Sequence, residues 1–191
     1  VLIADPDVLV WKSRTSGTTN KLNEINWFKY NDGSSGFLIV GDNGTLLSQG
    51  SFNTWGLRDN LTSNNLMGIT YGNGTYVVVG SSGHISTSSD GDSWTNRSSQ
   101  AGSNSINAVT YANSKFIAVG DSGTIISSSD GTTWTLRSSG TNNQLNAISY
   151  GKNIFLAVGN LGTILKSTDG ITWSSKNSGT SNHINDILVS E

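Results

Sequence analysis

The sequence predicts an all-β protein: a five-bladed β-propeller of four-stranded antiparallel blades, in a single domain spanning residues 1–191. Two observations lead to this prediction. Tryptophans recur at spacings of 39 to 44 residues, and the same four short apolar runs accompany each of them. Units of about 40 residues that each form a four-stranded meander bury one another when they repeat around an axis. The recurring tryptophans are Trp11, Trp55, Trp94, Trp134 and Trp173.

Each complete unit has four parts, and each part is typical of a strand. The parts are short, alternating or β-branched, and bounded by Gly, Asn, Asp or Ser. In the unit 106–144 they are INAVTY, FIAVG, GTIIS and a run that starts at Trp134. The second and third parts meet at GDNG, GSSG, GDSG or GNLG, where glycine provides the positive φ that a tight hairpin needs.

The predicted blades are 22–65, 66–105, 106–144, 145–183, and a fifth made of 184–191 together with 1–21. In the fifth, INDILV is the first strand, and VLIADPDVLVW aligns with TIISSSDGTTW of 124–134 as the third and fourth strands. Both chain ends would then close the last blade and remove exposed sheet edges. This blade is one strand short, because nothing in it matches SKFIAVGDSG of 114–123. Three explanations stay open: a three-stranded blade, an incomplete chain, or a strand donated by a neighbouring chain.

The string SxDGxxW stands intact at Ser88–Trp94, Ser128–Trp134 and Ser167–Trp173, and in degenerate form at Gln49–Trp55 and Asp5–Trp11. It resembles the Asp box, or BNR repeat, of sialidase-like and photosystem II assembly-factor-like propellers. The resemblance covers nearly the whole chain and implies the propeller fold. We expect a structural role: the aspartates accept backbone N–H groups of their own turn, the glycines take the left-handed conformation, and the tryptophans cover the hairpin. These residues are Asp90, Gly91, Trp94, Asp130, Gly131, Trp134, Asp169, Gly170 and Trp173.

The composition narrows the range of partners. Charged residues make up 13% of the chain, the net charge is −2, and no basic stripe exists to meet phosphates, so we expect no nucleic-acid partner. No apolar run is long enough to span a membrane, and cysteine is absent. His84 and His183 occupy unrelated positions of the unit, so we expect no metal site and no cofactor. A weakly charged, hydroxyl-rich surface without cysteine favours an extracellular or cell-surface protein.

One pair of carboxylates departs from the repeat. The third position of the first strand is Gly68, Ala108 or Ala147 in three units, but Glu24 and Asp186 in the other two. These units are neighbours around the predicted ring, and first strands line its axis, so both carboxylates are expected to face one region of the channel. They are interpreted as solvated channel charges, as a contact for a cation or ligand, or as a general acid/base pair.

Three aromatic residues fall outside the repeat, namely Phe28, Tyr30 and Phe52, all in the first complete unit. They suggest a ligand contact on a longer loop, or a loop decorated without a partner. By contrast, the arginines Arg14, Arg58, Arg97 and Arg137 each follow a recurring tryptophan by three residues. One arginine per blade does not converge on a substrate as the three arginines of sialidases do.

Taken together, these patterns favour a non-catalytic binding or assembly module that recognises a glycan or a protein, or that builds a surface structure. A homo-oligomer formed through strand donation belongs to this hypothesis. The first alternative is an enzyme resembling a glycoside hydrolase or lyase that uses Glu24 and Asp186. The second is a scaffold like the photosystem II assembly factors.

Overall fold

The structure is a computed structural model that describes residues 2–4, 11–29, 35–49, 55–58 and 61–189. Within these residues the protein is all-β, with four four-stranded antiparallel sheets and one two-stranded hairpin. The hairpin pairs β1 (Leu2–Ala4) with β2 (Trp11–Ser13). The sheets are β3 (Leu22–Lys29), β4 (Ser35–Gly41), β5 (Leu46–Gln49), β6 (Trp55–Leu57); β7 (Leu66–Gly72), β8 (Thr75–Gly80), β9 (Ile85–Ser88), β10 (Thr95–Arg97); β11 (Ile106–Ala112), β12 (Lys115–Gly120), β13 (Ile125–Ser128), β14 (Thr135–Arg137); and β15 (Leu145–Gly151), β16 (Ile154–Gly159), β17 (Ile164–Ser167), β18 (Ser174–Lys176).

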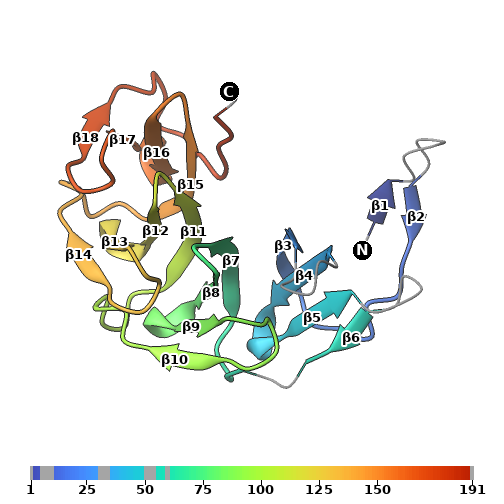
Figure 1. Ribbon diagram of the computed structural model, residues 1–191. Helices are drawn as coiled ribbons and strands as arrows, with labels where there is room; N and C mark the ends of the chain where they lie inside the picture. Colours follow the sequence, from blue (N-terminus) through green and yellow to red (C-terminus); the bar gives the residue numbers. More distant parts are fainter. Residues whose placement is uncertain (1, 5–10, 30–34, 50–54, 59–60, 190–191) are drawn as a thin grey trace.

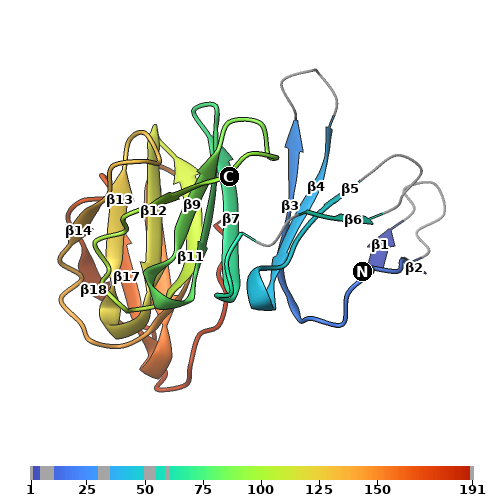
Figure 2. The same ribbon diagram turned by 90° about the horizontal axis from the view of Figure 1, so that it is seen from below.

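The four sheets stand around a common centre as propeller blades, numbered here one to four in chain order (Figure 1). Each blade is a simple meander, so its first strand lies at the inner side and its fourth strand at the outer side. Figure 2 shows the sheets side by side, with the β1–β2 hairpin beyond the first blade on the side away from β7. The predicted all-β propeller of four-stranded antiparallel blades is confirmed.

The predicted fifth blade and its closure need correction. The structure has four sheets rather than five, and the arc is open between the β1–β2 hairpin and the segment that follows blade four (Figure 1). The segment 184–189 carries the predicted INDILV strand, yet it makes no strand ladder with described residues. The physical reason is that a first strand forms its ladder with the second strand of its own blade. The chain contains no second-strand sequence for this blade.

Segment 184–189 nevertheless lies where a fifth first strand belongs. Asn23 and Asn107 each donate a side-chain N–H to the carbonyl oxygen of the residue that opens the next blade, Leu66 and Leu145 respectively. Asn146 makes the same bond to the Ile184 carbonyl oxygen, at 2.9 Å. The repeated asparagines therefore join each first strand to the next one, as hydrogen bonders at strand starts.

The hydrophobic core lies between the blades, and each interface is built in the same way. The second strand of one blade contributes two aliphatic residues two positions apart, and they pack on the aromatic residue that opens the second strand of the next blade. The aliphatic pairs are Leu38/Val40, Val77/Val79 and Ile117/Val119, and they meet Tyr76, Phe116 and Phe155. All nine side chains are at most 2% exposed.

The turn between second and third strands requires glycine twice, for different reasons. In GDSG, Gly123 has φ of 68°, as the sequence predicts. Gly120 is extended, but a Cβ there would overlap the Ser105 carbonyl oxygen at the start of the same blade. The first glycine is thus needed for close backbone approach and the second for its positive φ.

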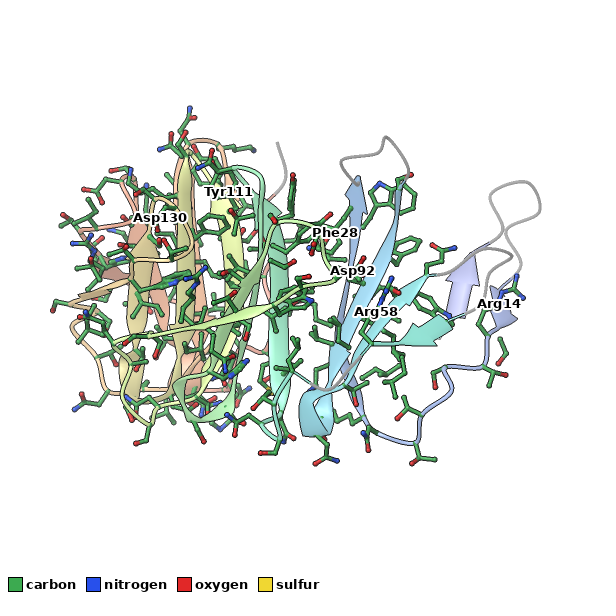
Figure 3. All side chains as sticks on the ribbon, turned by 60° about the horizontal axis from the view of Figure 1, so that its bottom comes forward. Arg14, Phe28, Arg58, Asp92, Tyr111 and Asp130 are labelled. Carbon is green, nitrogen blue, oxygen red and sulfur yellow. The ribbon has the colours of Figure 1, made fainter. Side chains whose placement is uncertain are left out.

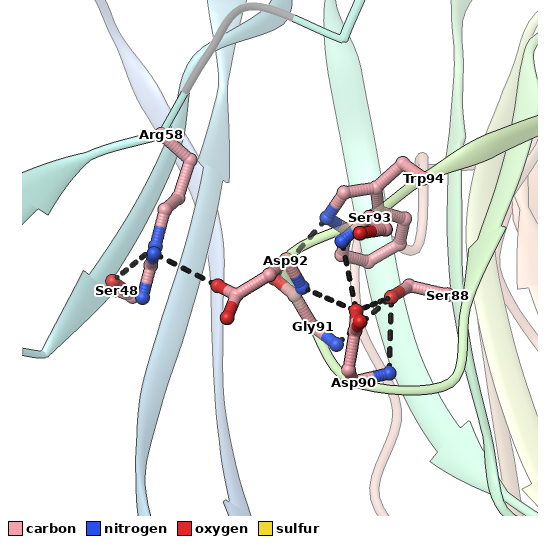
Figure 4. Close-up of polar contacts among 8 residues, drawn as sticks. All are labelled: Ser48, Arg58, Ser88, Asp90, Gly91, Asp92, Ser93 and Trp94. Carbon is pink, nitrogen blue, oxygen red and sulfur yellow. Dashed lines mark hydrogen bonds and ion pairs between the residues drawn. The ribbon is translucent and has the colours of Figure 1, made fainter.

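Each Asp box is a closed set of hydrogen bonds, shown for Ser88–Trp94 in Figure 4. Asp90 Oδ1 accepts the backbone N–H groups of Asp92 and Ser93, each at 2.8 Å, and the hydroxyl of Ser88 at 2.8 Å. The Ser88 hydroxyl oxygen accepts the backbone N–H of Gly91 at 2.8 Å. These bonds from Ser93, Asp92 and Ser88 lower the pKa of Asp90 to about 2. The same bonds recur in the other two boxes.

The boxes also contribute to the interfaces between blades. Trp134 is 2% exposed and packs with Val77 and Val79 of the preceding blade, while its indole N–H donates to the Gly131 carbonyl oxygen at 2.8 Å. Trp94 and Trp173 pack in the same way at the other two interfaces. The structural interpretation of the box motif therefore holds at atomic detail.

Replacing Trp134 by alanine should lower the free energy of unfolding by about 3–5 kcal/mol, because it leaves a cavity between two blades. Leu136→Ala is the matched control: Leu136 is 54% exposed on the neighbouring strand, so its loss should change stability by no more than about 0.5 kcal/mol. Urea unfolding followed by circular dichroism measures both variants. Equal losses for the two would contradict the assigned packing role.

Asp130→Ala should cost about 1–2 kcal/mol of stability near pH 7, since two backbone N–H groups and a hydroxyl lose their acceptor. The bonds hold the pKa of Asp130 well below its usual range, so this contribution is present above the ordinary value of 3.8 and is lost as the pH falls below it. The comparison variant is Asp92→Ala, which removes only an exposed ion pair and should cost less than about 1 kcal/mol. Chemical unfolding at several pH values provides the measurement.

Candidate functional site

The off-repeat aromatic residues do not gather at an exposed loop. Tyr30 and Phe52 lie outside the described residues. Phe28 is 3% exposed and lies between the first two blades, where its ring meets the rings of Tyr71 and Tyr76 edge to face (Figure 3). The physical reason is strand alternation: β3 continues to Lys29, so Phe28 faces β7 while Trp27 faces the opposite way. Phe28 therefore packs the core instead of meeting a ligand on a loop.

Glu24 connects the inner strands of blades one and two. Its Oε2 accepts the backbone N–H of Ile69 at 2.7 Å, from a position on β3 that faces β7. Gly68 leaves the necessary room, because a Cβ there would come within 3.3 Å of the same oxygen. Burial raises the pKa of Glu24 to about 7, although the Ile69 N–H opposes the shift. At neutral pH the carboxyl group is thus divided between its two protonation states.

Asp186 approaches Glu24 from the other end of the chain. It lies on segment 184–189 and is exposed, and its Oδ1 accepts the N–H of Ile187 at 2.8 Å. Its charge is close enough to raise the pKa of Glu24 further, as the smallest of the three causes. The structure therefore brings into one neighbourhood the two carboxylates that the repeat analysis singled out.

A small cavity opens beside Glu24. It has a volume of about 150 Å³ and is lined by Leu22, Asn23, Glu24, Ile25 and Ile39. Next to it Ile25 is 43% exposed and Trp27 is 53% exposed. The Trp27 ring lies edge-on against Phe37, with 4.9 Å between the ring centroids. We call Ile25, Trp27 and Phe37 the first-blade face.

Sequence reasoning missed the first-blade face. Trp27 occupies the same repeat position as Tyr71 and Tyr111, which are partly buried at the interfaces between blades. The pattern therefore predicts a core residue. The available signal was the missing strand of the adjoining fifth blade, because that is the blade expected to cover this face.

The arginines do not form a common site. Arg58, Arg97 and Arg137 each donate their Nε–H, at 2.8 Å, to a hydroxyl on the third strand of their own blade. Arg58 also makes an ion pair with Asp92 in the Asp box of the next blade, at 2.8 Å (Figure 4). As the spacing predicts, these side chains brace outer strands and do not clamp a substrate.

A second hollow, of about 380 Å³, lies between the loops that end blades two and three. Its lining is mostly hydroxyl and amide groups, with Leu136 and Arg137 at one side. Among the described residues, no group of three histidines, cysteines or acidic residues could hold a metal ion. A search of the same residues found no helix long and apolar enough to cross a membrane.

Neither a protein-family model nor a curated protein sequence matches the chain. Solved structures do resemble it. YCF48 from Cyanidioschyzon merolae aligns with 92% of the chain at a TM-score of 0.68 and 18% identity, and YCF48 bound to D1 peptide aligns with 90% at 0.67 and 17%. An ancestral GH74 enzyme aligns with 87% of the chain at 0.65 and 15%.

These similarities concern the fold. The chain spans 58% and 62% of the two YCF48 chains and 27% of the GH74 enzyme. YCF48 is a photosystem II assembly factor and a β-propeller, so the resemblance inferred from the Asp boxes is confirmed at the level of architecture. The chain is a propeller of the kind that these proteins share.

Glu24→Gln should stabilise the protein by about 1–3 kcal/mol near pH 8 and leave it nearly unchanged near pH 4. The folded pKa lies above the ordinary value of 4.5, so the stability that the protonated group supplies is complete below that value and is lost as the pH rises toward 7. Glutamine keeps an acceptor for Ile69 without becoming charged. Asp186→Asn, at an exposed position, should have a much smaller effect. A pH series of thermal unfolding curves checks both, and a destabilised Glu24→Gln protein at about pH 8 would refute the assignment.

Proposed function

We propose that this chain is a non-catalytic propeller module that binds a protein partner. The observation that carries the proposal is the first-blade face, where Ile25 and Trp27 are about half exposed beside a cavity of about 150 Å³. The corresponding residues of blade two, Ile69 and Tyr71, are buried or partly buried in the core. Exposed aromatic and aliphatic side chains beside a hollow are typical anchors of protein interfaces.

The propeller neighbours support the same proposal, since one of them is YCF48 bound to a D1 peptide. The carboxylate pair supports it less directly. Glu24 already accepts the Ile69 N–H and Asp186 accepts the Ile187 N–H, so each carboxylate has one oxygen engaged within the fold. Both residues thus have a structural role at the inner edge of the first-blade face.

Enzymatic function is the second candidate, and one observation favours it. A carboxyl group with a pKa of about 7 near a second carboxylate has the properties of a general acid in glycoside hydrolysis. The similarity to an ancestral GH74 enzyme is consistent with such chemistry but rests on the fold alone. Under this alternative, the protein cleaves model glycosides and Glu24→Gln abolishes the cleavage.

Glycan recognition in an extracellular setting also belongs to this proposal. The polar hollow between blades two and three offers hydroxyl and amide groups, and Trp27 offers a ring face of the kind on which sugars stack. A protein partner is preferred because Ile25 and Phe37 extend the exposed ring into an apolar surface.

Three assays on the purified chain separate these functions. Selection from a random peptide display library should enrich extended apolar peptides, and binding should weaken at least tenfold in Trp27→Ser. A glycan array and a panel of model glycosides should give no specific signal. Enrichment of no peptide class, together with hits on the array or hydrolysis that Glu24→Gln abolishes, would overturn the proposal.

A further inference from the structure

The first-blade face differs from its counterparts in one respect: it lacks the strand that covers them. At the three described interfaces the covering residues come from the second strand of the preceding blade, as the pairs Leu38/Val40, Val77/Val79 and Ile117/Val119. Under these pairs Ile69 is 0% exposed and Val109 is 7% exposed. Ile25, at the same repeat position, is 43% exposed. The internal repeat therefore specifies what covers such a face, namely a strand with two aliphatic residues two positions apart.

The second boundary of this uncovered region is segment 184–189. It is fixed to blade four by the Asn146 bond to the Ile184 carbonyl oxygen and by the Val189 N–H, which donates to Ser149 Oγ at 3.1 Å. Its chain lies at a first-strand position without a ladder, and Leu188 is 88% exposed. Its Asp186 lies near Glu24 on β3, which places the segment and the first-blade face on the same side of the channel.

We infer that the first-blade face and segment 184–189 form the two sides of a slot for one extended strand of a partner protein. The strand would pair antiparallel with segment 184–189 and place its aliphatic residues on Ile25 and Trp27. This inference deepens the proposed function and rests on it. Adding a strand to a free edge is a common way for proteins to bind extended peptides, because main-chain bonds supply affinity and alternate side chains supply specificity.

The register follows from the complete blades. In blade three, Ala108 pairs with Val119 and Thr110 pairs with Ile117. By the repeat, Asp186 and Leu188 take the places of Ala108 and Thr110. The exposed Leu188 would therefore lie directly across from the first aliphatic residue of the incoming strand, where cross-strand packing is strongest.

A second copy of the chain is a poor source of such a strand. Every described second strand, β4, β8, β12 and β16, is already paired on both edges within its own sheet. Donating one of them would dismantle a complete blade. An extended segment of another protein carries no such cost, so the inference names a partner protein as the occupant.

The chain itself provides a test peptide. The sequence SKFIAVGDSG of residues 114–123 is a complete second strand with its turn, and it carries the aliphatic pair Ile117 and Val119. A synthetic peptide of this sequence should bind the full chain, as measured by fluorescence anisotropy of a labelled copy. The same peptide with asparagine at both aliphatic positions keeps the backbone donors and should bind at least tenfold more weakly.

Matched variants locate the binding. Trp27→Ser should weaken peptide binding at least tenfold, while Leu57→Ser, at a 59% exposed position on the outer strand β6, should leave it unchanged. Both sites are exposed, so both variants should unfold at the temperature of the parent protein. Hydrogen exchange should also show that peptide binding protects amides in segment 184–189.

The outcomes separate this inference from the proposed function. If selected peptides bind the chain but the SKFIAVGDSG peptide does not, or if its binding is insensitive to Trp27→Ser, the slot is refuted and the general binding function stands. If no peptide binds, both fail. If analytical ultracentrifugation shows self-association that Trp27→Ser abolishes, the face joins copies of the chain and the inference is overturned.

Discussion

The structure depends on one repeated contact, in which two aliphatic side chains of a second strand pack on the aromatic residue of the next blade. Each sheet is only four strands wide, and its inner and outer strands are short. An isolated sheet of this size buries too little apolar surface to be stable alone, so each blade relies on its neighbours. Phe116, for example, is completely buried, and the cluster around it includes Val77 and Val79 of the blade before.

The Asp boxes secure this contact at the outer side of each blade. Their hydrogen bonds hold a tight turn whose glycine lies against the preceding blade: a Cβ on Gly131 would meet Val77, Thr75 and Phe116. The carboxylate does not pair with a cation there but accepts the N–H groups of its own turn. This explains how a chain with 13% charged residues keeps three ionised aspartates in structural roles.

The fold was predictable because the repeat carries most of it. Trp134, Asp130 and Gly131 recur in equivalent places, so their roles in one unit define their roles in the others. Trp27 shows the limit of this reasoning. Its repeat position predicts burial, but burial also depends on the neighbouring blade, and no pattern within β3 reports whether that neighbour is complete. Phe28 was within reach, since strand alternation alone places it opposite Trp27.

The carboxylate site was predictable only in part. The departure of Glu24 and Asp186 from the repeat, together with the inner position of first strands, indicated that they share a region. The partner of Glu24 was not predictable, because it is the main-chain N–H of Ile69, and a backbone donor has no signature in the sequence. The raised pKa follows from that burial between β3 and β7 and could not be anticipated from residue types alone.

The interfaces are directional, and this explains why the open arc has two unlike ends. Every blade presents an aliphatic pair on one side and an aromatic residue on the other. At the blade-four end, segment 184–189 lies against β15 through Asn146 and Ser149, and Val158 of the outgoing pair is 1% exposed. At the blade-one end, Ile39 is 1% exposed while Ile25 and Trp27 remain open. The uncovered surface is thus confined to the inner part of one face, with the dimensions of a single strand and not of a whole blade.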